Sequence, residues 1–130
     1  PQTRFVAEFI GKTNLIDGRA EGAATVARGG LRLRVASASL TPGAPVAVSI
    51  RPHQIELAPR ASAGATATPE TNVLTGTVVR ASYLGDGVDY QIQVEGSDVV
   101  LRVAGPAPQR VRLGESVSVS VAVSACVPLP

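Results

Sequence analysis

The residues best suited to chemistry stand in one short stretch, Arg51-Pro52-His53-Gln54-Ile55-Glu56. It contains the single histidine of the sequence, with a guanidinium two residues before it and a carboxylate three residues after it. Arg51, His53 and Glu56 could bind an anion or a carboxylate, or make a polar contact between two subunits. In the alternative interpretation, Arg51 binds carbonyl groups at a chain corner and His53 faces water, since isolated surface charges contribute little.

A second group of polar residues surrounds a glycine-rich turn, Tyr83-Leu84-Gly85-Asp86-Gly87. Tyr83, Gly85 and Asp86 could contact a ligand or a partner chain, because loop tips often carry function. The structural alternative is that the glycines serve a tight turn. Tyr90, further along, has the inward register of a core residue, whereas both interpretations stay open for Tyr83.

Catalysis by this chain is not expected. A nucleophile, a base and an orienting group must lie within reach of one another, and one histidine without a nearby aspartate does not supply them. The single cysteine, Cys126, has no CxxC partner for a metal and is expected to be a small buried hydrophobe. The sequence also lacks the phosphate loop G-x-x-x-x-G-K-S/T, so we expect no cofactor in this chain.

The sequence around these residues predicts strands. Before the first group, Val46, Val48 and Ile50 alternate with polar or small residues, the period of a half-buried strand. Pro52 then ends pairing on one side, because it has no amide hydrogen. After the glycine turn, a second alternating run, Val88 to Val94, predicts the return strand of a hairpin.

The pattern before Leu57 recurs after residue 71. An Asn-apolar-x-x-Gly strand begins at Asn14 and again at Asn72, and each is followed by a hairpin, a Leu-Arg-Val strand, an x-Gly turn and an alternating valine strand. We therefore expect a first OB-like repeat at 14–57, a connecting loop at 58–71 and a second OB-like repeat at 72–130. Residues 1–13 are expected to form one short helix, with Thr3 as its cap and Gly11 as its stop.

Composition agrees with a small β domain. The 130 residues are 45% hydrophobic but 3% aromatic, so valine, leucine, isoleucine and alanine must fill the core. Thirteen glycines and ten prolines indicate short strands and many turns. The sequence predicts an all-β fold of two interleaved OB-like lobes, since neither half could bury much alone. A start at Pro1, without an initiator methionine, suggests a piece of a longer protein.

The order of these motifs resembles a known family. The run Phe5-Val6-Ala7-Glu8-Phe9-Ile10-Gly11, followed by Asn14, resembles the end of the nucleotide-binding domain in ABC importer ATPases. The rest of the chain resembles the TOBE-type regulatory domain that follows it, and the residues that carry this resemblance are Ser49-Ile50-Arg51-Pro52, Ile55, Leu57, Asn72, Gly76, Tyr83-Leu84-Gly85 and Tyr90. The subgroup it is most similar to serves polyamine, ferric iron, phosphonate and related solutes.

The resemblance implies a non-catalytic regulatory tail of an ATP-binding subunit, on the cytoplasmic side of the inner membrane. It implies pairing with a second copy of the subunit, contact with permease subunits through the parent ATPase domain, and in some relatives a small ligand. ATP and Mg would belong to the parent protein, because the Leu-Ser-Gly-Gly-Gln stretch of the ATPase is also missing here. The family most often has glutamate after Arg-Pro where this chain has His53, as some sulfate-type relatives do, which leaves the solute open.

Two alternatives come from other classes of protein. OB-like barrels often bind single-stranded nucleic acid, but that requires stacking aromatic residues over a basic groove. The β region offers Tyr83 and Tyr90 beside Asp86, Asp89 and Glu95, so we expect no nucleic acid. A small oxyanion could instead be held between lobes by backbone amides at glycine turns, as in related molybdate-responsive domains.

Overall fold

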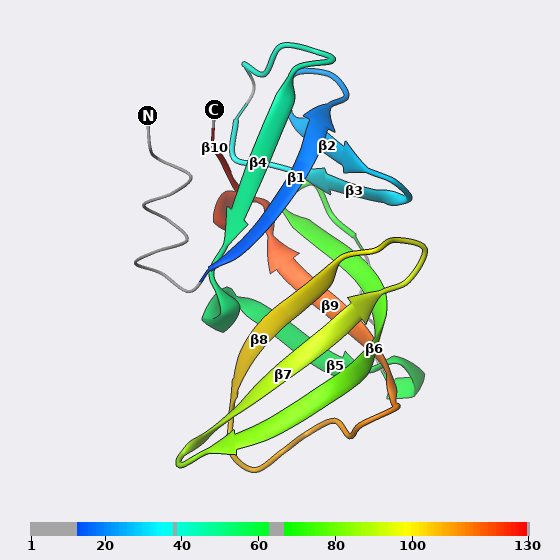
Figure 1. The fold of residues 1–130 in the computed structure, drawn as a ribbon, viewed down its shortest axis with the longest axis vertical. Helices are drawn as coiled ribbons and strands as arrows, with labels where there is room; N and C mark the ends of the chain where they lie inside the picture. The colour runs from blue at the N-terminus through cyan, green and yellow to red at the C-terminus, as the bar shows by residue number, and fades with distance from the viewer. Residues whose placement is uncertain (1–12, 38, 63–66, 130) are drawn as a thin grey trace.

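The computed structural model describes residues 13–37, 39–62 and 67–129, which form two five-stranded sheets (Figure 1). The strand order is β10-β4-β1-β2-β3 in the first sheet and β5-β9-β6-β7-β8 in the second. The sheets define what we call the first lobe and the second lobe. The helices of the described residues are three 3₁₀ turns, so the predicted all-β fold of two interleaved OB-like lobes is confirmed. The helix predicted over 1–13 lies, apart from Thr13, outside the described residues.

The strands of the first lobe are β1 (Asn14–Ala20), β2 (Thr25–Arg28), β3 (Leu31–Arg34), β4 (Pro45–Ile50) and β10 (Val127–Leu129). Those of the second lobe are β5 (Ile55–Pro59), β6 (Thr71–Leu84), β7 (Gly87–Val94), β8 (Val100–Pro106) and β9 (Ser116–Ala122). The 3₁₀ turns are η1 (Pro52–Gln54), η2 (Arg60–Ser62) and η3 (Val123–Ala125).

Buried and exposed side chains alternate along the strands, so each strand turns one face toward the core. On β7, Val88, Tyr90, Ile92 and Val94 are all buried, while the residues between them are partly exposed, as the sequence pattern predicts. Both lobes contribute to one continuous cluster of buried apolar side chains. Valine, leucine and isoleucine dominate that cluster, so branched aliphatic packing replaces the aromatic packing that the sequence lacks.

The two lobes exchange their last strands. β5 follows β4 in sequence, but it pairs antiparallel with β9 of the second lobe. β10, at the end of the described chain, returns to pair with β4 of the first lobe. In Figure 1 these crossings run between the upper and the lower sheet. The division of the chain into repeats at 14–57 and 72–130 stays a prediction, whereas the expected connecting loop at 58–71 contains the end of β5 and all of η2.

The hairpin tips of the two lobes also meet. An added Cβ at Gly30 would lie 2.4 Å from the Gly96 carbonyl oxygen, so a side chain has no room there. Beside this contact, Arg28 donates two hydrogen bonds of 3.0 Å to the Asp98 carboxylate. These hydrogen bonds lower the pKa of Asp98. The Asp98 side chain is 70% exposed and that of Arg28 is 40% exposed, so this pair orients the tips more than it stabilises them.

A candidate binding cleft between β5 and β8

The first predicted group of residues surrounds η1. Pro52 occupies the first turn of η1, where a missing amide hydrogen costs nothing, and the Ile55 N–H closes the turn on the Pro52 carbonyl. Arg51, His53 and Glu56 are all exposed. His53 and Glu56 line a cleft beside η1, whereas Arg51 does not. Whether these three residues bind a ligand stays a prediction.

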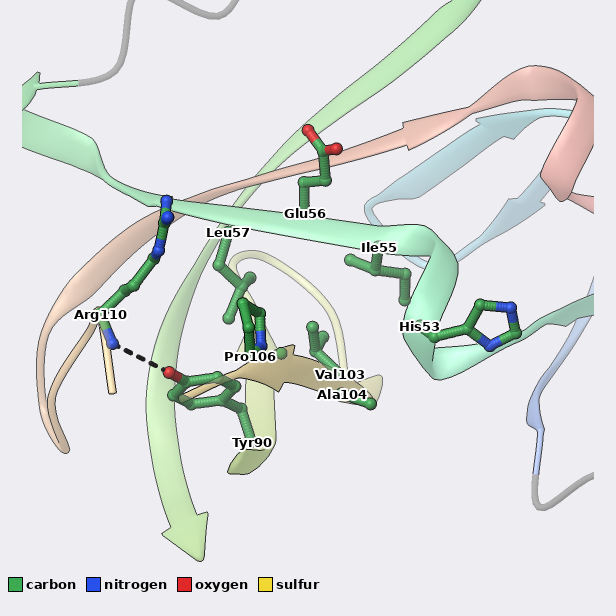
Figure 2. Close-up of a pocket in the computed structure, with 10 residues that line it drawn as sticks. His53, Ile55, Glu56, Leu57, Tyr90, Val103, Ala104, Pro106 and Arg110 are labelled. Atoms are coloured by element: carbon green, nitrogen blue, oxygen red, sulfur yellow. Dashed lines mark hydrogen bonds between the residues drawn. The ribbon is translucent and has the colours of Figure 1, made fainter. Parts of the chain in front are cut away.

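The cleft lies between the two edge strands of the second lobe and measures about 370 Å³ (Figure 2). Residues of η1 and β5 form one wall, and residues 103–106 of β8 form the other. Ile55 and Val103 are buried behind these walls. The Glu56 carboxylate points away from Tyr90 in Figure 2. The cleft therefore combines an apolar interior with main-chain edges on both sides.

Tyr90 forms the floor of the cleft, and its side chain is 3% exposed. Its hydroxyl oxygen accepts a hydrogen bond of 3.1 Å from the Arg110 main-chain N–H (Figure 2). The ring packs against β8 at Gly105, where an added Cβ would lie 3.1 Å from a ring carbon. The inward register that the sequence indicates for Tyr90 is confirmed, and its hydroxyl holds the chain that follows β8.

The second predicted group lies at the tip of the β6–β7 hairpin. Tyr83 is 62% exposed, and Gly85 has a φ of +73°, which a residue with a side chain rarely adopts. The Asp86 carbonyl accepts a hydrogen bond of 3.3 Å from the Ala107 N–H. None of these three residues lines the cleft, so the structure does not bring the two predicted groups into one site.

Two asparagines cap edge strands in the same way in each lobe. The Asn14 side chain accepts from the Arg102 N–H at 2.7 Å and donates to the Arg102 carbonyl at 2.9 Å. The Asn72 side chain makes the same pair of bonds with Arg34, at 3.0 and 2.9 Å. A carboxamide that makes both bonds replaces one residue of a missing neighbour strand. Sequence reasoning found the two asparagines as a repeat but not this role, because it depends on pairing between lobes.

Sequence reasoning also missed most of the cleft wall. Leu57, Ala104 and Arg110 have ordinary positions in the sequence, and a cleft between two edge strands has no local signature. The described residues hold no group of three or more histidine, cysteine, aspartate or glutamate side chains that could bind a metal. What the cleft offers chemically is hydrogen bonding from main-chain and side-chain groups. No helix among the described residues is long and apolar enough to cross a bilayer.

Comparisons with known proteins agree with this architecture. The TOBE domain model matches residues 48–129. The Fe(3+) ions import ATP-binding protein FbpC of Brucella abortus (strain 2308) is 32% identical over 99 residues, which covers 73% of this chain and 25% of that protein. The spermidine/putrescine import ATP-binding protein PotA of Nostoc sp. (strain PCC 7120) is 38% identical over 104 residues, or 72% of this chain and 26% of that protein.

A third relative, PotA 1 of Pseudomonas aeruginosa, is 32% identical over 130 residues, which covers 94% of this chain and 33% of that protein. This chain thus spans between a quarter and a third of the length of these relatives. Among solved structures, a crystal form of the cytoplasmic molybdate-binding protein ModG with molybdate bound superposes with a TM-score of 0.74. That match covers 90% of this chain and 96% of ModG at 18% identity, so it shows the fold alone.

Proposed function

The chain belongs to the TOBE domain family, and from that membership we propose that it is the regulatory domain of the ATP-binding subunit of an ABC solute importer. The observation that supports this most directly is the match over residues 48–129, together with relatives that are ATP-binding subunits of importers. In this proposal the parent protein binds ATP and Mg through a separate domain. This chain itself contributes contacts between subunits and regulation of the ATPase, and it takes no part in ATP hydrolysis.

The proposal includes three partners. A second copy of the subunit pairs with this one, permease subunits contact the parent ATPase domain, and the assembly lies on the cytoplasmic face of the inner membrane. Exposed apolar side chains of the second lobe, Tyr83, Leu84 and Leu113, are compatible with a contact between subunits. Nucleic acid is not a proposed partner, since the described aromatic side chains of the second lobe include one exposed residue, Tyr83.

The test is to clone the whole reading frame that contains this chain and to purify its product. We expect the whole product to bind and hydrolyse ATP in the presence of Mg, and residues 1–130 to do neither. Deletion of residues 14–129 should leave ATP binding intact but change the oligomeric state or the control of hydrolysis. A reading frame without a nucleotide-binding domain, or ATP binding by residues 1–130 alone, would contradict the proposal.

Sensing of a small ligand is the finer part of this proposal. A thermal-shift series with a polyamine, phosphonate, sulfate, molybdate and a ferric complex tests it on residues 1–130. A saturable rise in the unfolding temperature with one solute would identify the ligand class, because a ligand that binds the native state stabilises it. The absence of a shift with every solute would leave a purely structural and regulatory role.

A further inference from the structure

We propose that the cleft between β5 and β8 is a binding site for a small organic carboxylate, a molecule with one anionic end and a short apolar chain. The inference goes beyond the proposed function, because it is argued from the cleft alone and requires neither nucleotide nor transport. It rests on the size of the cleft, its apolar interior, the main-chain donors on its walls and the position of its charged side chains.

The size of the cleft sets the size of the ligand. β5 and β8 stand at the two ends of the strand order, so among the described strands no ladder joins one to the other. η1 and β5 nevertheless lie close to β8, which leaves no room for a further strand between the edges. The cleft volume of about 370 Å³ is near the lower end for ligand pockets, so it suits a small molecule.

The interior of the cleft is apolar. Ile55 and Val103 are buried, and Tyr90 forms the floor. Leu57 is partly buried and packs against the core. Side chains alternate along β5, so Ile55 and Leu57 lie on one face of the strand and Glu56 lies on the other. A short aliphatic chain on this surface would be removed from water, which favours binding.

The ladder of β8 fixes which of its main-chain groups face the cleft. Arg102 directs its N–H and C=O away from β7, because both are bonded to Asn14. Every second residue of an antiparallel ladder faces the same side, so Ala104 also directs its N–H away from β7. Ala104 lines the cleft and is exposed. Its N–H can therefore donate to a ligand.

The same reasoning applies to β5. The Val123 N–H donates to the Glu70 carbonyl, which assigns the odd-numbered residues of β9 to the ladder with β6. The even-numbered serines of β9 therefore bond to β5, at Glu56 and Ala58. Leu57 lies between these two residues, so its N–H faces away from β9, on the side of the cleft. Each wall thus supplies one main-chain donor, and a carboxylate accepts hydrogen bonds of this kind.

The charged side chains of the lining favour an anion. They are Arg110, His53 and Glu56, and all three are exposed. Figure 2 shows Arg110 at one end of the cleft and His53 at the other, while the Glu56 carboxylate points away from the floor. The Tyr90 hydroxyl accepts from the Arg110 main-chain N–H, which holds this residue beside the floor. A guanidinium is always charged, so the ligand carboxylate should lie beside Arg110.

The probe is hexanoate, titrated into isotope-labelled residues 1–130 while the backbone amide resonances are followed. We expect saturable shifts at Leu57 and Ala104 at millimolar concentration, as is usual for so small a ligand. Butyrate, which has two methylene groups fewer, should bind roughly tenfold more weakly, because each buried methylene contributes about fourfold. Hexylamine is the matched control of opposite charge and should not bind.

A pair of variants tests the guanidinium. Arg110→Gln removes the charge but keeps the main-chain N–H that donates to Tyr90. It should weaken hexanoate binding about fivefold, since an exposed charge is partly screened by water. Arg112→Gln removes another exposed guanidinium two residues along, outside the cleft lining, and this variant should bind hexanoate like the parent protein.

Four results would each overturn the inference. They are no shift of any resonance with hexanoate, equal binding of hexylamine, shifts confined to residues outside the cleft lining, and an Arg110→Gln protein that binds hexanoate as tightly as Arg112→Gln. The amide spectrum of each variant shows whether it folds, and the comparison of hexanoate with hexylamine tests the unmodified chain if a variant does not. None of these results bears on the ATP-binding test of the parent protein.

Discussion

At the scale of single residues, Asn14 and Asn72 connect the lobes. Each is buried, and each satisfies both main-chain groups of an arginine on the edge strand of the other lobe. Asn14 lies on β1 and reaches β8, whereas Asn72 lies on β6 and reaches β3. The two asparagines therefore make equivalent contacts in opposite directions, one from the first lobe to the second and one from the second lobe to the first.

Replacement of either asparagine by alanine should destabilise the protein. Asn14→Ala and Asn72→Ala each leave a main-chain N–H and C=O without a partner, and each should cost about 2 kcal/mol in the free energy of unfolding. Urea unfolding measures this. Gln109→Ala is the control, since its amide bonds a carbonyl two residues away, and it should cost less than about 1 kcal/mol. If both asparagine variants lose no more unfolding free energy than Gln109→Ala, the asparagines do not stabilise the contact between the lobes.

Cys126 is a buried thiol whose pKa is raised from 9.0 to about 11, mainly by burial. Above pH 9 the unfolded thiol loses its proton while the folded thiol keeps it. Stability should therefore fall as the pH rises from 9 to 11, by about 1.4 kcal/mol per pH unit from this group. Chemical unfolding of the protein and of Cys126→Ala at several pH values isolates the effect, and equal slopes in both would show that the thiol does not contribute.

At the scale of elements, two glycines allow close strand crossings at matching places in β1 and β6. An added Cβ at Gly18 would lie 2.4 Å from the Ala27 carbonyl oxygen. One at Gly76 would lie 2.6 Å from Ile92 and 2.8 Å from the Gln93 carbonyl oxygen. These glycines end the Asn-apolar-x-x-Gly pattern, so that pattern marks where the next hairpin packs against the strand.

Gly76→Ala should therefore destabilise the second lobe. The new methyl group must displace the Ile92 side chain and a backbone carbonyl, and overpacking of this kind costs roughly 1–3 kcal/mol. Thr77→Ala, the exposed neighbour, should change stability by less than about 0.5 kcal/mol. Thermal unfolding of both variants measures the difference, and a Gly76→Ala protein as stable as the control would contradict the close packing.

Most elements could be predicted from sequence because their signals are local. The alternation from Val88 to Val94 fixes both a strand and its buried face, and Gly85 and Gly87 fix the turn before it. Local signals do not show which other strand a given strand pairs with. Ile55 to Pro59 alternates in the same way whichever edge it joins, so the sequence could not show that β5 leaves the first sheet. The cleft depends on that choice and was not predictable for the same reason.

At the scale of the whole molecule, the exchange of β5 and β10 makes each sheet depend on both halves of the chain. The shared core reinforces this dependence. The lobes should therefore not unfold one after the other. A single sheet without its exchanged strand would expose both an edge and part of the core.

Unfolding should accordingly be one cooperative transition. Calorimetry should give equal calorimetric and van't Hoff enthalpies, and probes placed in the two lobes should report the same midpoint. Removal of residues 126–130 should abolish the cooperative transition of both lobes rather than of the first alone. Two resolved transitions in the intact protein would show that the lobes are independent.

The exchanged strands also bear on how such a chain could arise. A polypeptide with residues 14–59 alone would carry four strands of one sheet and a fifth that belongs elsewhere. Two copies of it could satisfy each other by trading that fifth strand, which is the arrangement found here between the halves of one chain. Gene fusion of a strand-swapped pair would then need nothing more than the linker between Pro59 and Thr71.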